Sequence, residues 1–181
     1  AIYRAQQLDK IFAKNGIVGE LFCIPITIKD NIDIIGMETT SGSYALKGTL
    51  PIKDAKLVKK LKEENAIIIA KTTMDELAMG MNGFSSFNGR AGNPYDTTKN
   101  PGGSSAGAAA SISANFAVIA IGTDNSGSIR IPAAFNGIYG IRPTQNSISS
   151  DGIFPMGNID GTAGVMTRTV TDLAISLKVL S

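Results

Sequence analysis

Serine and lysine are the residue types in this chain that are suited to nucleophilic chemistry, and they occur together in three short segments. Lys29 ends the first segment, which is an apolar run. Ser104 follows two glycines in the second, and Ser128 lies in the third, a tight turn. A serine hydroxyl becomes a good nucleophile when a neighbouring base takes its proton. Turns at helix starts also expose backbone N–H groups, which favour anions and developing oxyanions.

Histidine is absent from the 181 residues. This excludes a Ser-His-Asp triad, a Cys-His pair and a His-ligated zinc centre within the chain. A base would therefore be a lysine, a carboxylate or an activated water. We expect no metal and no cofactor. The single cysteine, Cys23, excludes an internal disulfide and favours a reducing compartment, so we expect a cytoplasmic location.

The charge and hydropathy patterns argue against direct nucleic-acid binding and against a membrane span. Seventeen basic and fifteen acidic residues give a net charge of +2. The basic cluster at 56–62 alternates with apolar residues, as on the outer face of an amphipathic helix, so we expect no direct nucleic-acid binding. No apolar run is long enough for a membrane span.

The elements that must position these segments alternate along the chain. Apolar runs predict buried strands at 21–28, 66–70 and 116–121, the first starting at a bulge or an edge. Helical spacing, caps or small residues predict helices at 3–14, 54–64, 73–79, 104–115 and 169–180. This order is typical of an α/β fold with a mixed, largely parallel sheet flanked by helices. We find no linker that would divide the chain.

Each segment also has an ordinary structural interpretation. Lys29 can be a surface lysine beside Asp30, and the glycine-serine turns can be plain loops. A phosphate cradle is a third interpretation of the turn at 101–107, but that turn lacks the Gly-Lys-Ser/Thr ending of a P-loop. The residues alone do not join the three segments into one site.

The order of the motifs resembles the amidase signature family. The similarity is strongest for Pro-Gly-Gly-Ser-Ser-Ala-Gly at 101–107, followed by Gly-Thr-Asp at 122–124 and Gly-Ser-Ile-Arg at 127–130. Matches at 19–31 and 164–172 extend it over nearly the whole chain. The resemblance implies the amidase signature fold over residues 1–181 as a single core. It also implies that the family's N-terminal helices and C-terminal region are lacking.

The resemblance further implies an amidohydrolase that cleaves a carboxamide C–N bond through an acyl-enzyme. Lys29 falls on the family's catalytic lysine, Ser104 on its bridging serine and Ser128 on its nucleophile. The family holds the bridging serine through a cis peptide, which here is the Gly103–Ser104 bond.

Other residues take supporting roles by the same resemblance. The oxyanion hole would consist of the backbone N–H groups of Asn125, Ser126, Gly127 and Ser128. Ser105 would orient Ser104 or its neighbours, Asp124 would fix the turn by binding its backbone N–H groups, and Arg130 would brace it. The substrate pocket would include Met79, Gly80 and Phe84.

Three functions remain open from the sequence. The first is an amidohydrolase acting on a small or apolar carboxamide. The second is the glutaminase subunit of a tRNA-dependent amidotransferase, which would need partner subunits; a homodimer is also compatible with the sequence. The third is an inactive amidase-like binding protein or fragment, because Ser126 stands where the family usually has glycine.

Overall fold

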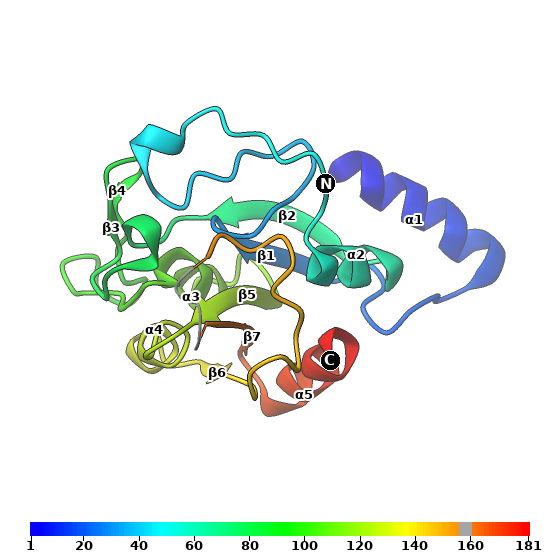
Figure 1. The fold of residues 1–181 in the computed structure, drawn as a ribbon. Helices are drawn as coiled ribbons and strands as arrows, with labels where there is room; N and C mark the ends of the chain where they lie inside the picture. The colour runs from blue at the N-terminus through cyan, green and yellow to red at the C-terminus, as the bar shows by residue number, and fades with distance from the viewer. Residues whose placement is uncertain (156–160) are drawn as a thin grey trace.

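The computed structural model describes residues 1–155 and 161–181 as a central sheet with helices on both faces (Figure 1). The helices and short 3-10 turns are α1 (Ile2–Asn15), η1 (Tyr44–Leu46), α2 (Lys56–Glu63), η2 (Glu76–Ala78), α3 (Ala106–Ser113), α4 (Arg130–Phe135) and α5 (Val170–Leu180). The strands are β1 (Pro25–Lys29), β2 (Ile67–Thr72), β3 (Phe84–Ser85), β4 (Gly89–Arg90), β5 (Ile119–Asp124), β6 (Tyr139–Ile141) and β7 (Thr162–Thr167).

The main sheet confirms the predicted class. Its strand order within the described residues is β2-β1-β5-β7-β6. Strands β2, β1 and β5 run parallel, whereas β7 and β6 pair antiparallel. Parallel neighbours end at the same edge of a sheet, which brings the residues that follow β1 and β5 together. The sheet is therefore mixed, with its parallel part carrying the segments of interest.

Strand β1 differs from the prediction in its place in the sheet. It begins at Pro25, where the missing N–H costs no interior ladder bond, and its register with β2 shifts between Ile26 and Thr27. The expected irregularity is thus present. Of the two predicted alternatives, a bulge or an edge, the bulge is confirmed, and β1 lies inside the sheet with a paired strand on each side.

Alternating side chains of the strands supply two separate cores. Ile119 and Ile121 of β5 face a cluster that includes Leu57 of α2 and Leu180 of α5. Ala120, between them, faces a cluster formed with α3 and α4. Small residues let α3 approach closely: a Cβ added at Gly107 would lie 2.8 Å from the Thr73 backbone.

The predicted helix at 73–79 is wrong. Only the 3-10 turn η2 forms there, and Leu77 within it has a left-handed φ of 52°. The carboxylate of Asp75 binds backbone N–H groups of the following loop, so it does not stabilise the first turn of a helix. The predicted helices at 3–14, 54–64, 104–115 and 169–180 are confirmed with small shifts at their ends.

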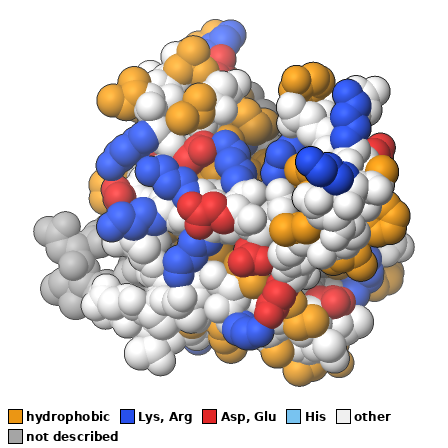
Figure 2. Space-filling view, turned by 90° about the vertical axis from the view of Figure 1, so that its right-hand side faces the viewer, with side chains coloured by type: hydrophobic (Ala, Val, Ile, Leu, Met, Phe, Trp, Pro, Cys, Tyr) orange, Lys and Arg blue, Asp and Glu red, His pale blue; other side chains and the backbone are white. Residues whose placement is uncertain are grey.

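The surface carries interleaved charges of both signs. Figure 2 shows basic and acidic side chains side by side on the face that it presents. Helix α2 is amphipathic as predicted, with Leu57, Val58 and Leu61 buried. Among the described residues, no helix is long and apolar enough to cross a membrane.

Candidate active site

Lys29 is the last residue of β1, and its side chain is fully buried. Its Nζ lies 2.7 Å from Ser104 Oγ and 2.8 Å from Thr123 Oγ1, with the Thr123 carbonyl oxygen at 3.4 Å. Thr123 belongs to the neighbouring strand β5, and Ser104 lies just before α3. The interpretation of Lys29 as a surface lysine is therefore excluded.

Burial changes the proton affinity of this amine. Desolvation lowers the pKa of Lys29 from 10.5 to about 7, although the charges of Asp75 and Asp124 act in the opposite direction. A neutral amine has two N–H donors and one lone pair. It can donate to Thr123 and accept the hydroxyl proton of Ser104, which is the arrangement that a base requires.

Ser104 is fully buried beside this amine. The Gly103–Ser104 peptide is cis, as the family resemblance implied. The Ser104 carbonyl accepts the backbone N–H of Asp75 at 3.2 Å, which ties the segment before α3 to the segment after β2.

Ser128 lies in the turn after β5, with 9% of its surface exposed. Its carbonyl oxygen accepts the backbone N–H of Ser105 at 3.1 Å, so the turn is fixed directly to the residue after Ser104. Ser128 also lines a cavity together with Gly103 and Ser126. The three segments that were separate in sequence thus meet at one edge of the sheet.

The turn after β5 is built around the buried carboxylate of Asp124. It accepts the backbone N–H groups of Gly127 at 2.7 Å and Ile129 at 3.0 Å, and two side-chain N–H groups of Arg130 at 3.1 Å. Burial alone would raise the pKa of Asp124, but these hydrogen bonds hold it below its usual value. Both expectations for this pair agree with the geometry: Asp124 binds the turn and Arg130 braces it.

The predicted oxyanion hole needs one correction. The Gly127 amide donates to Asp124, so this N–H points into the turn and not toward the cavity. Asn125, Ser126 and Ser128 line the cavity, and Gly127 is not among the lining residues. The candidate donors are therefore three.

Ser105 was expected to orient Ser104 or its neighbours, and its side chain contacts a neighbour. Its hydroxyl donates to the Thr123 carbonyl at 3.2 Å and accepts the Thr123 N–H at 3.3 Å. It reaches the strand that carries Thr123 and does not bind the Ser104 side chain. Ser105 thereby fixes the residue that contacts Lys29.

The cavity beside Ser128 has a volume of about 260 Å³, and one of its walls is the segment at 78–81. Met79 and Gly80, both predicted pocket residues, belong to this wall. Phe84 does not line this cavity: it lies in the β3–β4 hairpin and is 61% exposed, so its place in a substrate pocket stays a prediction. A cavity of this size suits a small group.

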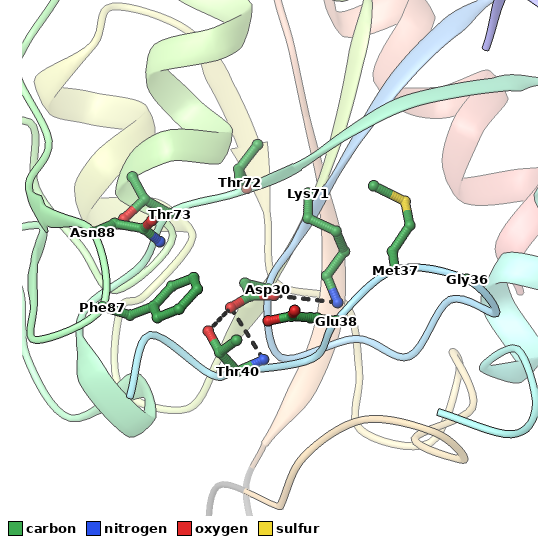
Figure 3. A pocket seen from close by; sticks show the side chains of 10 residues that line it. All are labelled: Asp30, Gly36, Met37, Glu38, Thr40, Lys71, Thr72, Thr73, Phe87 and Asn88. Atoms are coloured by element: carbon green, nitrogen blue, oxygen red, sulfur yellow. Dashed lines mark hydrogen bonds and ion pairs between the residues drawn. The ribbon is translucent and has the colours of Figure 1, made fainter. Parts of the chain in front are cut away.

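A second hollow lies beside Asp30, the residue after Lys29 (Figure 3). Figure 3 shows Asp30 between Lys71 and Thr40. Lys71 pairs with Asp30 at 3.3 Å, and Thr40 donates its N–H and its hydroxyl to the same carboxylate. The charge of Asp30 is therefore balanced by Lys71.

The comparison with known proteins decides the family. The sequence profile of the Amidase family matches residues 1–181, which is the whole chain. The chain belongs to the Amidase family.

Similar members of the Amidase family include components of amidotransferases. A glutamyl-tRNA(Gln) amidotransferase subunit of Staphylococcus saprophyticus is 42% identical over 181 residues, covering 100% of this chain and 37% of the relative. The corresponding subunit of Lactobacillus gasseri is 46% identical over 177 residues, covering 98% of this chain and 36% of the relative. The chain thus spans little more than a third of these relatives' length.

Solved structures of Amidase family members share the fold. The peptide amidase of Stenotrophomonas maltophilia superposes with a TM-score of 0.95 at 40% identity, over 99% of this chain and 38% of that one. The corresponding glutamyl-tRNA(Gln) amidotransferase subunit of Thermotoga maritima superposes with a TM-score of 0.88 at 39% identity, over 91% of this chain and 36% of that one.

Sequence reasoning missed two residues of this Amidase family site. Thr123 contacts the Lys29 amine, and Asp75 acts on its charge. The signal for Thr123 was its position next to the end of a buried strand, one residue before Asp124. Asp75 had no such signal, because its position resembled a helix start.

Proposed function

We propose that this chain carries the catalytic site of an amidohydrolase, with Ser128 as nucleophile, Ser104 as bridging hydroxyl and Lys29 as base. One observation carries the proposal: a fully buried lysine with a pKa of about 7 contacts Ser104 at 2.7 Å. An amine with a pKa near neutrality can both take and return a proton at physiological pH.

The first half-reaction forms the acyl-enzyme. Neutral Lys29 takes the Ser104 hydroxyl proton as Ser104 takes that of Ser128, and Ser128 Oγ attacks the carbonyl carbon of the amide. Backbone N–H groups of Asn125, Ser126 and Ser128 stabilise the oxyanion. The C–N bond then breaks, and the amine leaves with the proton that Lys29 returns through Ser104.

The second half-reaction releases the acid. Water gives a proton to the relay and attacks the acyl carbon, and the C–O bond to Ser128 breaks as the proton returns to Ser128 Oγ. The balance is one amide and one water consumed, and one carboxylic acid and one amine formed. The relay typically contributes about 10²–10⁴ to the rate, and each oxyanion donor about 10²–10³.

Fluorophosphonate labelling tests this proposal without knowledge of the substrate. The probe should attach covalently to Ser128, as mapped by mass spectrometry. The label should vanish in Ser128→Ala and persist in Ser147→Ala, which removes an exposed hydroxyl that donates to the Thr144 carbonyl. A folded sample without label at Ser128 would refute the enzyme and favour an inactive amidase-like binding protein.

We propose a glutaminase as the second candidate, because relatives 42% and 46% identical are components of glutamyl-tRNA(Gln) amidotransferases. The amide would then be glutamine, and partner subunits would receive the ammonia. Ammonia release from glutamine but not from small apolar amides would select this function over the first.

A homodimer and a cytoplasmic location remain proposals, the latter supported by the single cysteine. The single core over 1–181 is likewise a proposal.

A further inference from the structure

Asp75 has a buried carboxylate that holds the loop after the cavity wall. The residue is 4% exposed. Its two carboxylate oxygens accept backbone N–H groups from three consecutive residues: Asn82 at 3.0 Å, Gly83 at 2.9 Å and Phe84 at 3.4 Å. This loop directly follows Met81, which lines the cavity beside Ser128.

The same residue contacts the bridging serine through its backbone. The Asp75 N–H donates to the Ser104 carbonyl at 3.2 Å. The carboxylate also packs against two glycines of the cavity lining. A Cβ added at Gly80 would lie 2.5 Å from Asp75 Oδ1, and one added at Gly103 would overlap the carboxylate. Asp75 therefore lies behind the cavity, between its wall and the Ser104 segment.

The charges around Lys29 differ in how well they are balanced. Asp124 is paired with Arg130 at 3.1 Å and Arg142 at 3.7 Å, and Asp30 is paired with Lys71. Within residues 1–155 and 161–181, Asp75 forms no ion pair with a lysine or arginine. Backbone N–H groups stabilise its charge without cancelling it, and this charge favours the protonated form of Lys29.

We propose that Asp75 is a positioning residue: it holds the cavity wall and Ser104 in one arrangement, and its unpaired charge acts on the Lys29 amine. The inference rests on the proposed function, since it assigns Asp75 a part in activating Ser128. It also explains why a residue with the sequence signature of a helix start forms no helix. Its carboxylate is occupied by a loop seven to nine residues away.

The pH profile of labelling separates this role from a purely structural one. Removing the negative charge in Asp75→Asn should make Lys29 easier to deprotonate. The rate of fluorophosphonate labelling at Ser128 should then rise at a lower pH than in the wild type, by about half a unit or more. Its plateau should fall about 10-fold to 100-fold, because the wall and Ser104 lose alignment.

Glu76→Gln is the matched control. It removes an adjacent negative charge whose carboxylate binds Ser43 and Ser86, away from Lys29. We expect its pH midpoint to equal that of the wild type. An unchanged midpoint in Asp75→Asn, with Ser128 still labelled in the wild type, would overturn the Asp75 inference and leave the proposed function standing.

Two further measurements test the Asp75 inference if labelling of Asp75→Asn gives no clear result. Gly80→Ala pushes the carboxylate away without removing its charge and should lower the labelling plateau. Gly92→Ala should not, because its added Cβ would meet Thr97 at an ordinary 3.5 Å. If the wild type is not labelled, the proposed function fails. Titration of the Lys29 amine by heteronuclear NMR, in wild type and Asp75→Asn, then tests the charge effect alone; equal midpoints would overturn it.

Discussion

Thr123 Oγ1 lies 2.8 Å from Lys29 Nζ and accepts a second hydrogen bond from Asn31 Nδ2 at 3.0 Å. The same amine lies 2.7 Å from Ser104 Oγ, so Thr123 and Ser104 together fix its position. Under the proposed function, Thr123 therefore orients the base in the same way that a second hydrogen-bond partner orients a catalytic histidine.

Replacing Thr123 by valine tests that orientation. Thr123→Val keeps the side-chain volume but removes the acceptor for the buried amine, at a cost of about 1–3 kcal/mol. We expect the rate constant of Ser128 labelling to fall by about 5-fold to 150-fold, measured at a pH high enough that the rate no longer changes with pH. Thr98→Val, at an exposed turn, is the matched control and should label at the wild-type rate. Equal rates in the two variants would contradict the role of Thr123.

Replacing Lys29 by methionine removes the base and keeps an unbranched side chain. We expect the labelling rate to fall by about 10²–10⁴ and to lose its dependence on pH near 7. Time courses of label incorporation between pH 5.5 and pH 9 would measure both. A variant that keeps the wild-type pH profile would show that another group is the base.

The same variant should change how stability depends on pH. Since the pKa of Lys29 is lowered from 10.5 to about 7 on folding, the unfolded state binds more protons than the folded state between these values. The free energy of unfolding of the wild type should therefore rise with pH across this window. Below pH 7 the cost of burying the charge is fully present, up to about 5 kcal/mol.

Lys29→Met lacks this dependence. The free energy of unfolding of the variant, relative to that of the wild type, should therefore be highest below pH 7 and lowest near pH 10.5. Denaturant unfolding of both proteins at several pH values measures the difference. Groups common to both proteins, including Lys71, cancel in the subtraction. A difference that stays flat from pH 7 to pH 10 would show that the amine is not strongly desolvated.

Replacing Asp124 by asparagine should destabilise the turn that carries Ser128. An asparagine leaves an NH₂ group where backbone N–H groups and Arg130 now donate, which we expect to cost about 2–4 kcal/mol. Thermal unfolding would detect the loss. Asp96→Asn, in an exposed turn, should change stability much less, because solvent can satisfy the groups that it leaves. Equal effects of the two substitutions would refute the turn's dependence on Asp124.

The sheet and most helices could be predicted because their signals are local. Apolar runs marked β2 and β5, and the small residues of 104–115 marked α3. The candidate site residues were predicted from the order of the family's motifs along the chain. The spacing of the residues alone did not join the three segments into one site. Two expectations failed for one reason. The carboxylate of Asp75 and the amide of Gly127 are each placed by tertiary contacts, which the periodicity of the sequence does not encode.

The segment at 78–81 forms a wall of the cavity and belongs to neither a strand of the main sheet nor an α-helix. The proposed reacting groups stand at the end of buried β1, just before α3 and in the turn after β5, where changes of size disturb buried surroundings. Under the proposed function, positions 79 and 81 are therefore the ones to vary in order to change which amide the cavity accepts. Asp75 should stay fixed as the anchor to which any redesigned wall attaches.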